Sequence, residues 1–149
     1  MQSINKLNGL TKRKLSGRDY LSKLVSQFNG TRELNTKVAT FILIWEKSPE
    51  LAIKLGRCVT LGPSVQEKIV NCFGEIVCES EDVDEKNEAA RTLVSLNFPG
   101  VRALFELIVE QTKTHLSGKG FLNCPWLFVK PLDTYAVAVT ALSFLFTCE

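Results

Sequence analysis

The chain has 149 residues, of which 45% are hydrophobic and 23% charged, and its formal net charge is +2. This length is typical of one domain that buries its own core, and the composition matches that of an ordinary soluble globular protein. A net charge of +2 is too small to indicate a polyanionic partner by itself.

Residues 1–16 are polar and basic and show no periodicity, so we expect a flexible arm there. The first 23 residues hold six cations against one acid, Asp19, which gives a local charge of +5 (6 − 1). Such a cluster can neutralise phosphates, although a solvated tail has the same composition. If it binds RNA or DNA, the residues involved are Lys6, Lys12, Arg13, Lys14, Arg18 and Lys23.

No apolar segment typical of a secretory signal follows the first methionine, so we expect a cytoplasmic or nuclear location. The five cysteines are Cys58, Cys72, Cys78, Cys124 and Cys148. They form no CxxC pair or other common zinc-binding spacing, so free structural thiols are expected.

Helical periodicity begins at Gly17 and ends at Asn29–Gly30. Asn35 or Thr36 is expected to cap the next element, whose apolar run at 41–45 fits a buried strand or a buried helix. Its helical neighbours and the turn at Ser48–Pro49 favour the helix.

Ser48 as N-cap and Pro49 as first helical residue predict a short helix through Arg57. Residues 64–67 read as a capping box that starts another helix. Asp82 is expected to cap a helix over 83–96, and the strongly amphipathic segment from Val101 is expected to follow it.

Residues 134–148 carry no charge and are apolar on every side. Fifteen residues are fewer than the roughly 20 that span a bilayer, so the segment predicts a buried helix and not a membrane span. Asp133 or Thr134 is the expected cap. We expect the amphipathic helices to pack around this C-terminal helix.

The predicted fold is therefore all-α, a single globular bundle of about seven helices over residues 17–149. The alternative is a short helical repeat of the HEAT or armadillo kind. It is suggested by the similarity of residues 92–98 to residues 140–146, which are offset by 48 positions.

No catalytic, cofactor or metal site is predicted. The single histidine, His115, has no flanking motif that would pair it with Cys124 as a nucleophile. Residues 117–120 resemble a phosphate loop but lack the strand, the glycine spacing and the final hydroxyl. The acidic run 75–88, with a local charge of −6 (1 − 7), lacks a calcium-loop pattern.

The sequence favours a non-enzymatic module that binds another protein, in a regulatory or other interaction role. It could also bind itself, because segments of charge +5 and −6 attract each other and because a second subunit could cover the C-terminal helix. The alternative is a nucleic-acid-binding accessory or viral protein that uses the basic arm.

Overall fold

A computed structural model describes residues 17–116 and 131–147, and these residues form seven α-helices and no strand. The predicted all-α fold is confirmed. The chain divides into two compact units, residues 1–55 and residues 56–149, with the division inside helix α4 (Pro49–Cys58). That residues 17–149 act as the single domain expected from sequence stays a prediction.

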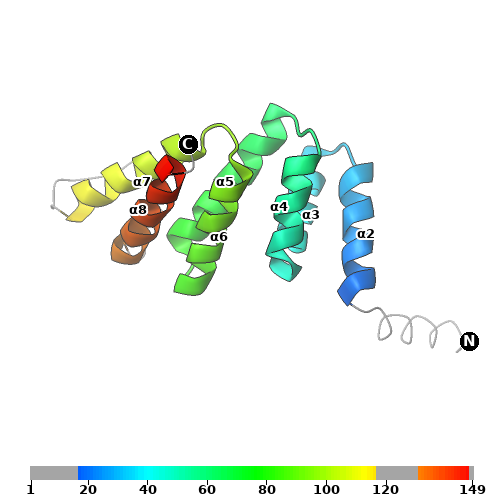
Figure 1. Cartoon of the computed structure of the whole chain (residues 1–149), viewed down its shortest axis with the longest axis horizontal. Coiled ribbons are helices and arrows are strands. Elements are labelled where there is room, and N and C mark those ends of the chain that lie inside the picture. The colour runs from blue at the N-terminus through cyan, green and yellow to red at the C-terminus, as the bar shows by residue number, and fades with distance from the viewer. Residues whose placement is uncertain (1–16, 117–130, 148–149) are drawn as a thin grey trace, which may run out of the picture. The chain divides into compact units, whose positions relative to one another are not determined.

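The first unit is built on helices α2 (Gly17–Gly30) and α3 (Leu34–Lys47), which a three-residue loop joins into a hairpin (Figure 1). Its core includes Phe28 and Phe41, both fully buried, whose ring centres lie 5.7 Å apart. The ammonium group of Lys37 lies 4.4 Å from the centre of the Phe28 ring and donates a hydrogen bond to the Phe28 carbonyl. The two helices are thus joined by both apolar and cation–π contacts.

The ambiguous apolar run at 41–45 is helical, as the neighbouring elements indicated, and three of its residues are buried: Phe41, Ile44 and Trp45. The predicted caps of this helix are wrong. The N-cap is Glu33, whose carboxylate accepts a hydrogen bond of 2.7 Å from the Thr36 amide. A carboxylate placed before the helix satisfies a free amide as an Asn or Thr side chain would, so the helix begins earlier.

The second unit consists of two helix pairs, α5 with α6 and α7 with α8, which pack together through α6 and α8 (Figure 1). The helices are α5 (Pro63–Glu79), α6 (Val83–Leu96), α7 (Val101–Leu116) and α8 (Pro131–Thr147). This is a compact helical bundle, and stacked pairs are also what the repeat alternative predicts.

The starts of α5 and α6 differ in how well the sequence predicted them. Asp82 caps α6 as expected, accepting a hydrogen bond of 3.0 Å from the Asp84 amide. The capping box at 64–67 is not formed, because α5 begins at Pro63 with Gly62 as N-cap and no side-chain cap. Proline fixes the helical φ angle and has no amide to satisfy, so it takes the first helical position ahead of Ser64.

The junction between α6 and α7 depends on two residues with positive φ. Asn97 ends α6 in the left-handed conformation, with φ 55°, and its amide donates to the Leu93 carbonyl. Gly100 has φ +92° and directly precedes α7. Asparagine and glycine are the residues that tolerate such backbone best, so the sequence allows this short turn.

Helix α8 packs on α7, α6 and α5, which confirms its central place within the second unit. The helix begins at Pro131, so Asp133 and Thr134 lie in its first turn and the predicted cap is wrong. The expectation that it is buried on every side is also wrong. Four of its large apolar side chains are exposed, with exposed fractions of 66%, 39%, 56% and 55% for Leu132, Val139, Phe144 and Phe146.

The reason is geometric. The neighbouring helices of this unit contact only part of the α8 circumference, where Val137, Ala138, Ala141 and Leu145 are buried. No helix among residues 17–116 and 131–147 combines the length and apolar character needed to cross a bilayer.

Candidate functional site

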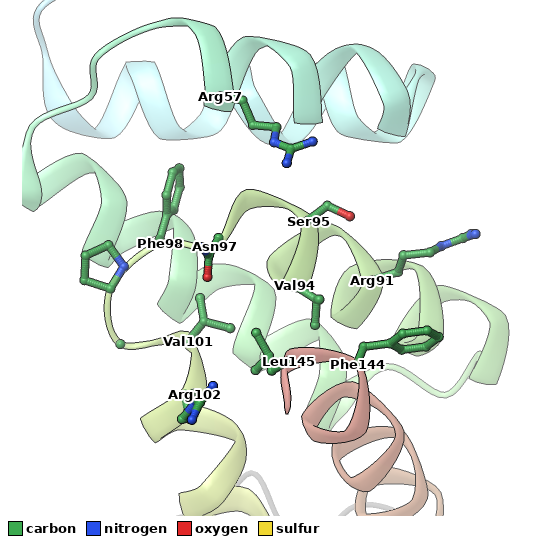
Figure 2. A pocket seen from close by; sticks show the side chains of 12 residues that line it. Arg57, Arg91, Val94, Ser95, Asn97, Phe98, Val101, Arg102, Phe144 and Leu145 are labelled. Carbon is green, nitrogen blue, oxygen red and sulfur yellow. The ribbon is translucent and has the colours of Figure 1, made fainter. Parts of the chain in front are cut away.

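The second unit has a cavity of about 740 Å³ where the C-terminal end of α6, the start of α7 and the end of α8 meet (Figure 2). We call it the arginine cavity, because three arginines and no acidic residue occur among the described residues that line it. The arginines are Arg57, Arg91 and Arg102, and the apolar lining residues are Val94, Phe98, Pro99, Val101, Phe144 and Leu145.

Each arginine reaches the cavity from a different helix. Arg57 lies in the last turn of α4, in the part of that helix that belongs to the second unit, and Figure 2 shows its guanidinium extending toward the cavity. Arg91 extends from α6, and it lines the cavity together with Phe144 of α8. Arg102 lies in the first turn of α7, where the positive end of the helix dipole adds to its charge.

Two of the arginines already have partners within the unit. Arg91 forms an ion pair with Glu88 one turn earlier, yet its side chain is 68% exposed. The guanidinium carbon of Arg102 lies 4.6 Å from the centre of the Phe146 ring. An exposed intrahelical ion pair contributes little to stability, so Arg91 can exchange Glu88 for a carboxylate of a ligand at a small cost.

A second hollow of about 480 Å³ lies between α6 and α8, and we call it the α6–α8 groove. Its apolar lining consists of Ala90, Val94, Val137, Ala141 and Phe144. Asp84 and Glu88 lie on its wall, near the start of α6.

The two hollows share three lining residues, Arg91, Val94 and Phe144. They therefore adjoin, apolar side chains line both, and we call the two together the depression. One end carries the carboxylates of α6, and the other carries the arginines. The charges reverse along the depression, so a ligand that fills it must have complementary polarity.

The basic cluster predicted from sequence is only partly described. Lys6, Lys12, Arg13 and Lys14 lie outside the described residues. Arg18 and Lys23 are exposed on α2. Five positions on a helix correspond to a rotation of about 140°, so these two cations do not share one face.

Sequence reasoning missed the arginine cavity because its residues come from four helices with no common spacing. The amphipathic pattern from Val101 predicts Arg102 on the solvent side of its helix, and no motif includes Arg57 or Arg91. Within the sequence, the one signal was the turn chemistry at 97–100, since a tight junction between α6 and α7 brings the ends of those helices together.

Three described cysteines form no disulfide: Cys58 is exposed, Cys72 is half-buried and Cys78 is buried. Burial raises the pKa of the Cys72 thiol, the nearby Glu75 raises it further, and Lys68 opposes the shift. Cys124, Cys148 and the His115 side chain lie outside the described side chains. Among the described residues, no group of three or more His, Cys, Asp or Glu side chains could hold a metal ion.

In comparisons with known proteins, no family model, no curated protein and no solved structure matches this chain.

Proposed function

We propose that the chain is a protein-binding helical module, and that the depression formed by the α6–α8 groove and the arginine cavity binds one amphipathic segment of a partner protein. The observation that carries this proposal is that the two hollows adjoin and share the lining residues Arg91, Val94 and Phe144. A groove between two helices, with an apolar floor and charged rims, is the common receptor for an amphipathic helix.

The chemistry of the partner segment follows from the lining. Apolar side chains at intervals of three and four residues would contact Val94, Val137 and Phe144 on the floor. Carboxylates at one end of the segment would meet Arg57, Arg91 and Arg102. Planar guanidinium groups bind carboxylates through paired hydrogen bonds, so the acidic end fixes the direction in which the segment lies.

Phe144 supports this assignment by its exposure. A phenylalanine that is 56% exposed gains apolar burial when a ligand covers it, and aromatic and arginine side chains are the residues that contribute most at interfaces. Phe144 and Arg91 line the same two hollows, so a ligand there can contact an aromatic and an arginine side chain together (Figure 2).

The test uses a labelled amphipathic helical peptide with leucines on one face and glutamates at one end. A second peptide with glutamines in place of the glutamates is the control, because lysines could bind Asp84 and Glu88 at the other end of the depression. Fluorescence anisotropy should show binding of the acidic peptide only. Phe144→Asp and Arg91→Glu should each weaken it by about tenfold or more, whereas Lys23→Glu on α2 should leave it unchanged.

The same samples separate this function from nucleic-acid binding. Labelled RNA and DNA oligonucleotides are titrated at low and moderate salt, with the whole chain and with a variant that lacks residues 1–16. Retention of oligonucleotides that needs residues 1–16, falls steeply with salt and ignores Arg91→Glu, together with no peptide binding, would replace the proposal with the nucleic-acid alternative.

A further inference from the structure

The face of α8 that points away from its own unit carries a regular apolar pattern. Five of its eight exposed residues recur at intervals of four, three, four and three positions, and we call them the α8 stripe: Leu132, Ala136, Val139, Ser143 and Phe146. The other three, Thr140, Phe144 and Thr147, lie to one side of the stripe. Leu132, Val139 and Phe146 are seven positions apart. This is the spacing of a coiled-coil seam.

On a helix with about 100° of rotation per residue, the α8 stripe occupies a sector of only about 80°. The buried residues of α8, such as Val137 and Ala141, lie on the opposite side. Of the residues that α8 contributes to the α6–α8 groove, Val137 and Ala141 belong to the buried side, and Thr140 and Phe144 lie between the buried side and the stripe. None of the four belongs to the stripe. The stripe is therefore a separate surface.

Exposed apolar residues are concentrated on α8. Of the seven large hydrophobic side chains that are exposed in the described part of the chain, four belong to this helix. From Thr134 to Thr147, α8 carries no charged residue. A partner helix with charged residues at the seam would bury them without a counter-charge, so the stripe fits an equally uncharged helix.

We propose that the α8 stripe pairs with the α8 stripe of a second copy of this chain, in an antiparallel arrangement with a twofold axis near Val139. Leu132 and Phe146, the other two large residues of the stripe, lie seven positions on either side of Val139. Antiparallel pairing places Leu132 against Phe146 of the partner subunit and Val139 against Val139 of the partner subunit. A twofold contact of this kind closes on itself and gives a dimer.

The residues between the large ones suit close packing. Ala136 and Ser143 are small, which lets two helices approach each other. The Arg102 guanidinium over one face of Phe146 lies at the edge of the stripe, and the ring is still 55% exposed. A helix of 17 residues is about 26 Å long, so the contact is small and the dimer is expected to form only at high protein concentration.

The test is the mass of the full chain measured by sedimentation equilibrium from low to high micromolar concentration. The wild type should rise from 16.6 kDa toward twice that mass. Val139→Glu should stay at the monomer mass with unchanged helical content. The matched control Val83→Glu, which changes an exposed valine of α6 outside the stripe, should behave as the wild type.

If Val139→Glu fails to fold, Leu132→Glu at the most exposed stripe position replaces it. A wild type that stays monomeric over the whole range, or a dimer that neither stripe variant weakens, would overturn the proposal. Neither result affects peptide binding to the α6–α8 groove, because the two surfaces share no residue.

Disulfide cross-linking of cysteine variants tests whether the two helices are antiparallel. The wild type is the control for cross-linking through its native cysteines. Under mild oxidation, Val139→Cys should give a disulfide-linked dimer across the twofold axis. Leu132→Cys should cross-link only when it is mixed with Phe146→Cys. Cross-linking of Leu132→Cys with itself would show parallel helices and contradict the antiparallel arrangement.

Discussion

At the scale of single residues, the hydroxyl of Thr112 is an exception to the rule that buried polar groups have a hydrogen-bond partner. The side chain is fully buried in α7, and its oxygen has no hydrogen-bond partner among the described residues. Thr92 in α6 is equally buried, but its hydroxyl donates a 2.8 Å hydrogen bond to the Glu88 carbonyl. The two threonines are equally buried and differ in whether the hydroxyl is hydrogen-bonded, so substitutions at the two positions can be compared directly.

Thr112→Val should raise the free energy of unfolding by about 1 kcal/mol, because it removes a buried unpaired oxygen without changing the side-chain volume. Thr92→Val should lower it by about 1 kcal/mol, because a satisfied hydrogen bond is lost. Urea denaturation of both variants measures the difference. Equal effects of the two substitutions would show that the Thr112 hydroxyl is satisfied in solution.

Substitution of Gly100 tests how much the backbone conformation alone contributes to the stability of the turn before α7. A methyl group at this position would meet no atom within 4 Å, but its φ of +92° is unfavourable for any L-residue with a Cβ. Gly100→Ala should therefore lower stability by about 1–2 kcal/mol. Gly30→Ala is the control, since that glycine has equal space and ordinary φ, and its substitution should be neutral or slightly stabilising.

The Cys72 thiol gives a pH-dependent prediction. Its raised pKa means that the folded state holds the proton at pH values where the unfolded thiol, with an ordinary value of 9.0, begins to lose it. The contribution of Cys72 to the free energy of unfolding is therefore fully present below the pKa of the unfolded thiol. It is lost as the pH rises through the pKa of the folded thiol.

Alkylation of Cys72, followed by mass spectrometry as a function of pH, should locate that titration. Glu75→Gln should lower the pKa and speed alkylation, and Lys68→Met should raise the pKa and slow alkylation. Glu79→Gln, a neutralisation at the exposed end of the same helix, serves as control. An unchanged profile in both Glu75→Gln and Lys68→Met would assign the shift to burial alone.

At the scale of elements, Lys86 links α6 to α8. The side chain is fully buried, and its ammonium group donates a 2.8 Å hydrogen bond to the hydroxyl of Thr134 in the first turn of α8. Lys86 is the single base of the acidic run 75–88, and no pattern in the sequence indicates that it is buried.

Lys86→Ala should lower the free energy of unfolding by about 2–4 kcal/mol, because it removes the packed aliphatic stem as well as the amine. Lys86→Met keeps most of the volume, so it should lie within about 1 kcal/mol of the wild type. Thermal unfolding of both variants measures this. An equal loss in the two would show that the hydrogen-bonded amine, and not the stem, stabilises the contact.

Which parts of the fold the sequence could predict follows from the range of the forces involved. Asp82, Ser48 with Pro49, and Gly30 act on their own helix ends, so α6, α4 and α2 begin or end close to where local chemistry places them. Burial of Lys86 and exposure of Phe144 depend on which neighbour packs against α8. No local pattern records that choice.

At the scale of the whole molecule, the two proposed surfaces differ in how they should respond to salt. The α8 stripe contains no charged residue, so its dimer should be insensitive to salt or strengthened by it. The acidic peptide meets three arginines, so its affinity should fall as the salt concentration rises. Sedimentation and anisotropy at two salt concentrations measure both, and parallel weakening would show that one surface serves both contacts.

The position of α8 in its unit restricts which amino-acid substitutions this helix can tolerate. One side of this helix faces its unit, a second flanks the α6–α8 groove, and a third carries the stripe. An ordinary amphipathic helix such as α7 leaves its solvent-facing positions open to almost any polar replacement. From Thr134 to Thr147, by contrast, a charge introduced at nearly any turn of α8 would damage the core or one of the two proposed surfaces, so several separate requirements act on this uncharged part of a single helix.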